Sequence, residues 1–134
     1  MERINYEENN FTMITDVGTD IIEVERIRKM IDEYGEKFLK RIFTVTEIAY
    51  CEQFGERKYE HFAARFALKE AFSKAIGTGL SNGFAFREVG VVNLPTGKPE
   101  LVLEGEMKNK WEHKKFHISL AHTVTNAIAF VAME

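Results

Sequence analysis

Residues 62–75 read FAARFALKEAFSKA, and the rest of the chain is arranged around this stretch. It contains no Gly or Pro and is rich in Ala, Leu, Lys and Glu, so it is predicted to form a helix. At about 100° per residue, Phe62 and Phe66 lie opposite Leu68 and Phe72, and no wide polar face remains. A helix that is apolar nearly all round belongs in the middle of a domain, so we predict that the other elements pack around it.

Two of the charged side chains in this helix share one face. Glu70 and Lys74 lie four residues apart on one face, beside the short side chains of Ala63 and Ala67. Bringing such charges into a core costs roughly several kcal/mol each unless they are paired or bind a ligand. An ion pair between residues i and i+4 is the structural alternative, and it contributes about 0.2–0.5 kcal/mol. The helix alone leaves both interpretations open.

The composition is that of one ordinary globular domain. The 134 residues suffice for a single core, and 45% hydrophobic with 29% charged residues is typical of soluble proteins. No apolar run reaches membrane-spanning length and no signal-peptide pattern opens the chain, so we expect a cytoplasmic location without membrane contact. The single cysteine, Cys51, excludes an internal disulfide, and we interpret it as a core residue. A net charge of -3 does not support nucleic-acid binding.

The segments before the central helix show one short strand and three helical patterns. Residues 1–12 are polar and acidic, and we expect a disordered extension before a single domain over 13–134. A strand over 13–18 leads to a helix from Ile21 to about Tyr34. Asp20 is the predicted N-cap of that helix, and Glu23 resembles the second member of a capping box. Two further helices are predicted, over 36–42 and from 45 towards 54, the latter led by a capping box of Thr44 and Glu47.

After the central helix the hydrophobic period changes from helical to two. A flexible loop over 77–83 precedes the change, and an exposed helical turn is expected over 105–113. The order of one strand, three helices and four strands indicates an α+β fold, with the central helix packed on an antiparallel sheet. The predicted strands are 84–92, 100–103, 115–121 and 125–132.

Two carboxylates from separate elements form the first candidate site. Asp20 lies where a strand meets a helix, and an N-cap uses one oxygen and leaves the other free for a ligand. Paired with Glu70, and with no His or Cys nearby in sequence, it suits Mg²⁺, which takes one or two protein carboxylates and completes its shell with waters and phosphates. Lys74 would then meet the same phosphates, and Gly77 would let backbone amides approach them.

Two further features have both a structural and a functional interpretation. His117 shares one face of the predicted last hairpin with Ser119, and a hydrogen-bonded structural histidine is the alternative to a ligand contact. Arg26 and Lys29 belong to a locally basic segment of an acidic protein. A solvated helix face is the default interpretation for them, and a docking surface for an acidic partner is the alternative.

Together these stretches resemble the holo-acyl-carrier-protein synthases, the short phosphopantetheinyl transferases. Residues 18–26 match the family pattern G-x-D-x-x-E-x-x-R, and residues 66–75 match F-x-x-K-E-x-x-x-K-A. Three short pieces, at 77–79, 97–99 and 117–119, follow in the expected order. The likeness runs from Met13 to the C-terminus, and residues 1–12 have no counterpart.

This resemblance implies the fold and the reaction of those enzymes. They transfer 4′-phosphopantetheine from coenzyme A to a serine of apo-acyl carrier protein in fatty acid biosynthesis, release adenosine 3′,5′-bisphosphate and require Mg²⁺. Asp20 and Glu70 match the Mg²⁺ ligands. Glu70 is the expected base, acting directly or through a metal-bound water, and Lys74 would stabilise the departing bisphosphate. The expected coenzyme A contacts are Lys69, Ser73, Lys74, Gly77, Pro99 and His117.

The resemblance also implies partners. A homotrimer with active sites at subunit boundaries is expected, and an acyl carrier protein is the second substrate. Carrier proteins are typically acidic, so a chain with a net charge of -3 needs a local basic patch to attract them. We assign Arg26 and Lys29 to that patch.

Two other functional classes remain open from the sequence. A Mg²⁺ phosphodiesterase that uses the same acidic pair on water would hydrolyse coenzyme A without a carrier protein. A non-catalytic domain whose basic helix binds acidic proteins would show no Mg²⁺-dependent binding of coenzyme A.

Overall fold

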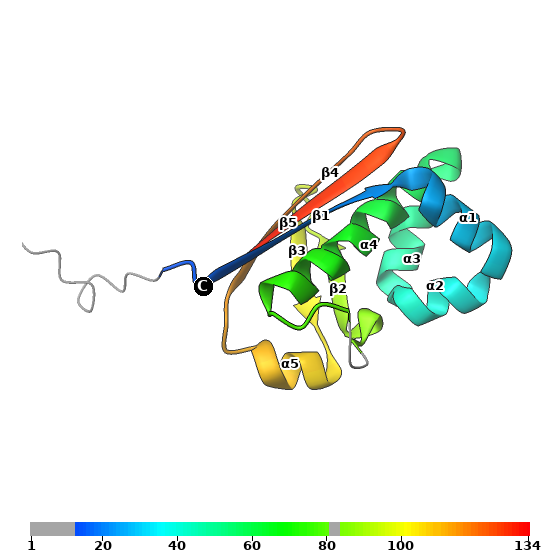
Figure 1. Ribbon diagram of the computed structural model, residues 1–134. Coiled ribbons are helices and arrows are strands. Elements are labelled where there is room, and N and C mark those ends of the chain that lie inside the picture. Colours follow the sequence, from blue (N-terminus) through cyan, green and yellow to red (C-terminus); the bar gives the residue numbers. More distant parts are fainter. Residues whose placement is uncertain (1–12, 81–83) are drawn as a thin grey trace, which may run out of the picture.

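The central helix predicted from the sequence is α4, Lys58–Ala75, in a computed structural model that describes residues 13–80 and 84–134. It lies between a sheet on one side and shorter helices on the other (Figure 1). The predicted extension over 1–12 and the middle of the predicted loop, 81–83, lie outside the described residues. The arrangement confirms the α+β fold with a central helix on an antiparallel sheet.

The remaining elements agree with the predicted order, with two short 3₁₀ turns added. In chain order they are β1 Asp16–Glu23, α1 Val24–Tyr34, α2 Glu36–Ile42, α3 Val45–Glu52, the 3₁₀ turn Gly55–Arg57, α4, the 3₁₀ turn Phe86–Glu88, β2 Val89–Asn93, β3 Pro99–Leu103, α5 Gly105–Trp111, β4 Phe116–His122 and β5 Asn126–Met133.

Two antiparallel sheets are present in the described residues. β1, β5 and β4 form a three-stranded sheet in that order, and β2 and β3 form a separate pair. Successive residues of a strand point to opposite faces, so Ile22 of β1 and Ala129 and Val131 of β5 are buried against α4. The inner face of the larger sheet and α4 thus form the main part of the core.

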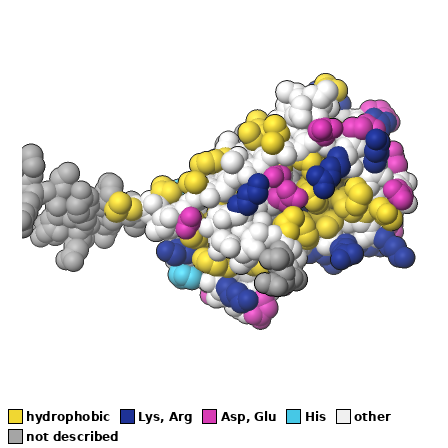
Figure 2. Space-filling view, viewed as in Figure 1, with side chains coloured by type: hydrophobic (Ala, Val, Ile, Leu, Met, Phe, Trp, Pro, Cys, Tyr) yellow, Lys and Arg dark blue, Asp and Glu magenta, His cyan; other side chains and the backbone are white. Residues whose placement is uncertain are grey.

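The outer face of the three-stranded sheet is apolar and exposed. Val17 and Ile21 of β1 are 53% and 66% exposed, and Ile128 and Phe130 of β5 are 44% and 43% exposed. His117 of β4 belongs to the same face, because it and Val17 lie opposite the same residue of β5. Figure 2 shows hydrophobic side chains along the side of the molecule where Figure 1 places this sheet. Exposed apolar faces of this kind are typical of surfaces that contact another molecule.

Asp20 is not the N-cap that the sequence predicted. β1 continues to Glu23, and Asp20 pairs with Ala129 inside the ladder. α1 begins at Val24, and its N-cap residue makes no side-chain capping hydrogen bond. The predicted helix start at Ile21 was wrong because pairing with β5 along the whole strand outweighs a local capping signal.

Two other local predictions had different outcomes. The capping box of Thr44 and Glu47 is confirmed, with both of its reciprocal hydrogen bonds present, at 3.0 and 3.1 Å. The strand predicted over 84–92 was wrong in its first half, because β2 begins only at Val89. In the 3₁₀ turn that precedes it, Phe86 stacks on Phe66 of α4, and this aromatic contact takes the place of strand pairing.

Two expectations drawn from composition can be compared with the structure. Cys51 is fully buried, and burial raises the pKa of its thiol to about 12, so it is a core residue as predicted. Within residues 13–80 and 84–134, no helix combines the length and hydrophobicity that a membrane crossing requires.

Gly18 brings β1 and α4 into close contact. A Cβ atom at this position would lie 1.9 Å from the carbonyl oxygen of Ala71 and 2.8 Å from the amide nitrogen of Ala75. A side chain therefore does not fit, and the strand approaches the helix more closely than any other residue would allow. Two residues further along β1, on the same face, Asp20 reaches α4 beside Glu70.

Candidate active site

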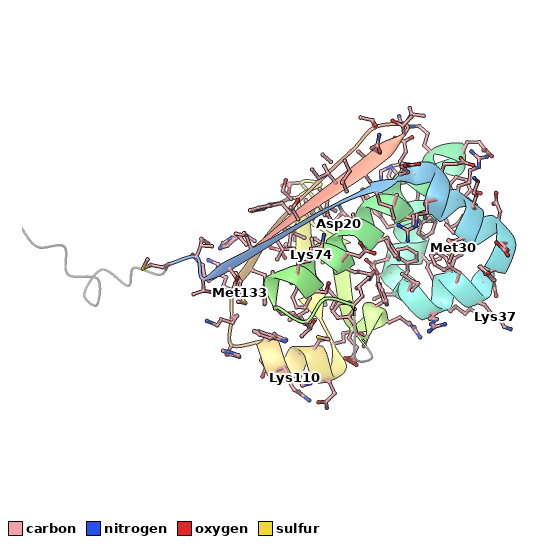
Figure 3. The ribbon with its side chains drawn as sticks, viewed as in Figure 1. Asp20, Met30, Lys37, Lys74, Lys110 and Met133 are labelled. Carbon is pink, nitrogen blue, oxygen red and sulfur yellow. The ribbon has the colours of Figure 1, made fainter. Side chains whose placement is uncertain are left out.

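Asp20 of β1 and Lys74 of α4 form an ion pair between two elements. The Nζ atom of Lys74 lies 3.1 Å from Oδ1 of Asp20 and 3.0 Å from the carbonyl oxygen of Thr19. The side chain of Asp20 is 10% exposed and that of Lys74 is 53% exposed. Figure 3 shows the two residues together where β1 crosses α4. Lys74 therefore pairs with Asp20 of β1 and not with Glu70 of its own helix, which was the structural alternative left open by the sequence.

Glu70 completes a pair of carboxyl groups with Asp20. Burial, then a hydrogen bond with Asp20 and the charge of Asp20, raise the pKa of Glu70 to about 7, although Arg26 and Lys74 act in the opposite direction. Two carboxyl groups this close share a proton near neutral pH unless a cation replaces it. The structure thus brings together the three residues predicted for metal binding and catalysis.

A hard divalent cation fits this pair. Oδ2 of Asp20 is buried without a hydrogen-bond partner, so one oxygen of a buried carboxylate is left for a ligand. No group of three or more His, Cys, Asp or Glu side chains able to hold a metal is found among the described residues. A two-carboxylate set, completed by waters and substrate phosphates, suits Mg²⁺ better than Zn²⁺. Asp20 and Glu70 are the residues that would hold it.

Helix α4 ends in a Schellman motif just beyond Lys74. Gly77 has φ of 84°, and its N–H donates to the carbonyl of Lys74 at 3.1 Å, while the N–H of Thr78 donates to the carbonyl of Ser73 at 3.1 Å. Gly77 is exposed and accessible to a ligand. Ser73 is only 1% exposed, and its hydroxyl donates to the carbonyl of Glu70 at 2.6 Å, so it offers a ligand little surface.

Lys69 does not lie in this site. Its side chain is fully buried, and its Nζ donates to Oε1 of Glu47 at 2.7 Å and to the carbonyls of Phe86 and Val89. An ammonium group has three protons, and all three are used inside the protein. The structure does not support the predicted contact between Lys69 and coenzyme A, because the side chain points into the core between α3, α4 and β2.

His117 and Pro99 line a different pocket, between β3 and β4. The imidazole of His117 lies 3.2 Å from the carboxylate of Glu134 and is 49% exposed. His117 is on the outer face of the sheet and Asp20 is on its inner face, so a single chain does not bring these two residues together. The other residues that line the pocket are Lys98, Glu100, Leu101, Lys115, Phe116 and Ile118.

The predicted docking residues lie on α1 beside the acidic pair. Arg26 is near enough to Glu70 for its charge to lower the pKa of that carboxyl, and Arg26 and Lys29 border one pocket. Both side chains are exposed. Figure 3 places the start of α1 next to the point where Asp20 meets α4. A partner bound along α1 would therefore lie close to Glu70.

A groove between α1 and α2 extends this surface, and the sequence reasoning missed it. Its lining combines apolar and basic side chains, and Met30 and Lys37 are labelled in Figure 3 on the face that also carries Asp20. The signal was available, because Met30 and Tyr34 lie four residues apart and outside the buried stripe of the helix. The groove is lined by Met30, Tyr34, Lys37, Phe38 and Arg41.

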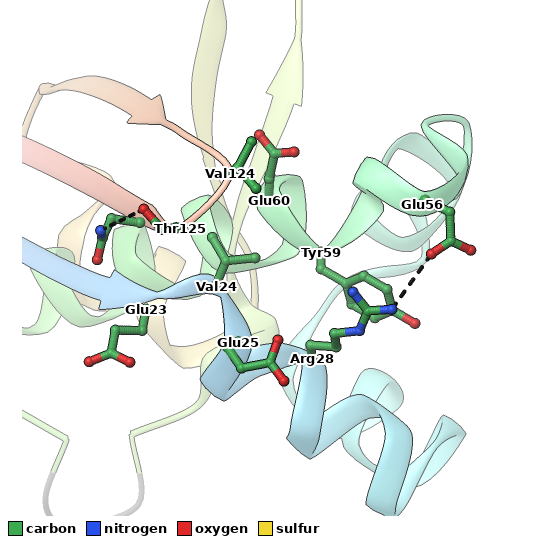
Figure 4. Close-up of a pocket in the computed structure, with 10 residues that line it drawn as sticks. Glu23, Val24, Glu25, Arg28, Glu56, Tyr59, Glu60, Val124 and Thr125 are labelled. Atoms are coloured by element: carbon green, nitrogen blue, oxygen red, sulfur yellow. Dashed lines mark hydrogen bonds and ion pairs between the residues drawn. The ribbon is translucent and has the colours of Figure 1, made fainter.

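Another pocket, at the junction of β1 and α1, does not suit phosphate groups. Figure 4 shows Glu23, Glu25 and Glu60 around it together with Arg28. The guanidinium of Arg28 is already paired with Glu56, at 3.6 Å. Glu60 is paired with Arg57, and Glu23 and Glu25 add two further negative charges, so the local potential is negative and repels anionic ligands.

Comparison with known proteins identifies the family of the chain. Residues 16–131 match the model of the 4′-phosphopantetheinyl transferase superfamily. The chain is 46% identical over 125 residues to the holo-[acyl-carrier-protein] synthase of Solibacter usitatus, which covers 91% of this chain and 99% of that protein. It belongs to the holo-acyl-carrier-protein synthase family. The resemblance stated from the sequence motifs is thereby confirmed, and this family member is a phosphopantetheinyl transferase.

Solved structures of the holo-acyl-carrier-protein synthase family share the fold. The synthase from Bacillus anthracis, solved in complex with CoA (3′,5′-ADP), is 40% identical and has a TM-score of 0.76, covering 92% of this chain and 98% of that one. The Neisseria meningitidis synthase is 35% identical with a TM-score of 0.79, covering 91% and 99%. The phosphopantetheinyl transferase fold predicted from the sequence is therefore confirmed.

Proposed function

We propose that this protein transfers the 4′-phosphopantetheine group from coenzyme A to a serine of an apo-acyl carrier protein. The observation that carries the proposal is the meeting of Asp20, Glu70 and Lys74 at one surface, where β1 crosses α4. The names of the relatives and the ligand of the Bacillus anthracis synthase support the substrates. Dependence on Mg²⁺, a role in fatty acid biosynthesis and a cytoplasmic location belong to the same proposal.

Asp20 and Glu70 would hold the Mg²⁺ ion. When bound, the cation would neutralise charge on the pyrophosphate oxygens of coenzyme A. The buried, unpartnered oxygen of Asp20 supports this assignment. The charges at the site support it too, because Lys74 and the nearby Arg26 offer two positive charges against two carboxyl groups and a pyrophosphate.

Glu70 is the proposed base and Lys74 the stabiliser of the leaving group. The serine oxygen forms a bond to the phosphorus that carries pantetheine, while the bond from that phosphorus to the bridging oxygen breaks and adenosine 3′,5′-bisphosphate leaves. Glu70 would be ionised beside the cation, and its carboxylate would accept the serine proton. Lys74 is half exposed, so its ammonium can exchange Asp20 for the departing phosphate oxygens. Gly77 is exposed and has no side chain, so it would let the same phosphates lie close to the end of α4, while its N–H stays bonded to the carbonyl of Lys74.

We further propose that coenzyme A binds between two copies of the chain in a homotrimer. His117 and Pro99 are proposed coenzyme A contacts, yet His117 lies on the opposite face of the sheet from Asp20. The outer face that carries His117 also exposes apolar side chains such as Ile21 and Phe130, and a second copy would cover them. A neighbour placed there would add its own acidic pair to this chain's His117.

The carrier protein is proposed to dock along α1. Arg26 and Lys29 offer positive charge next to Glu70, and the groove from Met30 to Arg41 continues the surface with apolar and basic side chains. Charge complementarity of this kind mainly raises the association rate with an acidic partner.

Mass spectrometry of apo-carrier protein incubated with this protein, coenzyme A and Mg²⁺ tests the function. We expect one phosphopantetheine group per carrier and an equal amount of adenosine 3′,5′-bisphosphate, and neither product when the carrier serine is replaced by alanine. Hydrolysis of coenzyme A without a carrier would indicate the phosphodiesterase instead. Binding of the carrier without either product would indicate a non-catalytic domain.

A further inference from the structure

Glu47 and Lys69 form an ion pair without solvent exposure in the centre of the molecule. The ammonium of Lys69 lies 2.7 Å from Oε1 of Glu47, and both side chains are 0% exposed. The same carboxylate accepts the N–H of Thr44 at 3.0 Å and, through its other oxygen, the N–H of Val91 at 3.2 Å. The pair therefore joins the first turn of α3, the middle of α4 and strand β2.

Lys69 also holds the segment that enters β2. Its ammonium donates to the carbonyls of Phe86 and Val89, and the ring of Phe86 stacks on Phe66 of α4 with centroids 5.7 Å apart. With Glu47 these acceptors use all three protons, so none remains for a ligand. Removing one member of such a pair leaves the other charge buried and unpaired, and the surrounding elements must move to relieve it.

We propose that Lys69 is a positioning residue for Glu70 and not a contact for coenzyme A. Helix α4 is held on one side by its close approach to Gly18 and on the other by the bonds of Lys69 to Glu47. Glu70 follows Lys69 directly in the helix, so a shift or rotation at Lys69 changes the distance between Glu70 and Asp20. The inference rests on the role proposed above for Glu70.

Reductive methylation of the folded wild-type protein, followed by peptide mass spectrometry, tests where Lys69 points. We expect Lys69 to stay unmodified with and without coenzyme A, and to react only after unfolding. Lys74 should be methylated and should be protected by coenzyme A. Methylation of Lys69 in the folded protein, suppressed by coenzyme A, would overturn the inference. Lys74 reports on the proposed coenzyme A site itself, so its behaviour separates a failure of that proposal from a failure of this one.

The variants Lys69→Met and Glu47→Gln test the positioning role, with kcat measured well below each melting temperature and the folded fraction checked by circular dichroism. We expect kcat to fall by about tenfold or more in both, because a displacement of about 1 Å can cost a hundredfold in rate. The dissociation constant of coenzyme A should stay within about twofold of wild type, since neither side chain reaches the ligand. The kcat of the double variant should be no lower than that of the less active single variant, because the two residues act as one unit.

Lys40→Met is the matched control, since Lys40 is an exposed lysine paired with Glu36, and it should leave kcat and the dissociation constant unchanged. A folded Lys69→Met protein that binds coenzyme A weakly, beside a Glu47→Gln protein that binds it normally, would make Lys69 a ligand contact. Folded variants with wild-type kcat would make the pair merely structural. Either result overturns the proposal. If Lys69→Met does not fold, the kcat of Glu47→Gln and the methylation experiment together test whether Lys69 positions Glu70 or contacts coenzyme A.

Discussion

The unpartnered oxygen of Asp20 favours a ligand site over a structural ion pair. A buried acceptor without a hydrogen bond costs about 1–3 kcal/mol. A salt bridge with the half-exposed Lys74 offsets little of that, because solvent screens such pairs. In the free protein the proton shared with Glu70 offsets part of this cost, and a cation that takes the free oxygen would relieve it further.

We expect Asp20→Asn and Glu70→Gln to abolish cation binding and transfer while keeping the fold. Each replacement keeps the size of the side chain and removes a charge that the cation needs. Calorimetric titration with Mg²⁺ or Mn²⁺, thermal melting and the carrier-modification assay measure the three properties. Turnover near the wild-type level in either variant would rule out the acidic pair as the metal site.

The affinity for the cation should depend on pH. The pKa of Glu70 is raised to about 7, so in the free protein this carboxyl holds a proton below that pH, and the proton competes with the cation. Affinity should therefore fall by about tenfold per pH unit below pH 7 and level off above it. Calorimetry in buffers of different ionisation enthalpy should show nearly one proton released per cation bound at about pH 6 and little release at about pH 8. Affinity that stays constant across this range would contradict the shared proton.

At the scale of elements, the approach of β1 to α4 sets the distance between the two carboxyl groups. We expect Gly18→Ala to lower both stability and activity, because its Cβ would meet the backbone oxygen of Ala71 at 1.9 Å. Overpacking of this kind costs about 1–3 kcal/mol, and it moves Asp20 away from Glu70. Thermal melting and cation titration measure the two effects.

Gly90→Ala is the control for this prediction. The atom nearest to its added Cβ is a side-chain methyl of Thr44, at 3.1 Å, which can move more easily than a backbone carbonyl. Its loss of stability should be smaller, and its cation affinity should not change. Equal effects of the two replacements would show that the contact at Gly18 has no special role in the site.

Helix α1 should control the encounter with the carrier protein. We expect Lys29→Glu to raise the KM for the carrier and to flatten its dependence on salt, with little change in the affinity for coenzyme A. Arg26→Glu should act in the same direction, although its charge also acts on Glu70. Rates at low and high salt measure the effect, since screening over about 8 Å at physiological salt weakens such attraction.

Lys110→Glu makes the same charge change on α5, far from α1 in Figure 3. It should leave the carrier KM near the wild-type value. If Lys29→Glu instead weakens coenzyme A binding and spares the carrier KM, the basic residues of α1 belong to the cofactor site.

The sequence predicted the elements better than the directions of their side chains. The apolar pattern of α4 and the capping box of α3 are local, so the corresponding helices were found. The end of β1 depends on pairing with β5, which is more than one hundred residues away, and for that reason Asp20 was assigned to a helix start. The helix α4 is apolar nearly all round, so its pattern did not reveal that Lys69 points into the core while Glu70 lies partly buried beside Asp20.

At the scale of the whole molecule, the outer face of the sheet should hold the copies together. We expect Ile21→Lys and Phe130→Lys to convert the proposed trimer to a monomer and to remove most of the activity, because both replace exposed apolar side chains on that face. Light scattering in dilute solution measures the assembly state. Val45→Lys changes an apolar side chain of α3 that is 75% exposed and should keep the trimer. An active monomer in dilute wild-type protein would refute the subunit-boundary site.

The separation of His117 from Asp20 on opposite faces of one sheet has a kinetic consequence. When each active site takes residues from two chains, the rate per chain depends on the fraction of chains that are assembled. Near the concentration at which the chains assemble, total activity would then rise more steeply than the protein concentration. A modest fall in the amount of protein would therefore lower the activity by a larger factor than the amount itself.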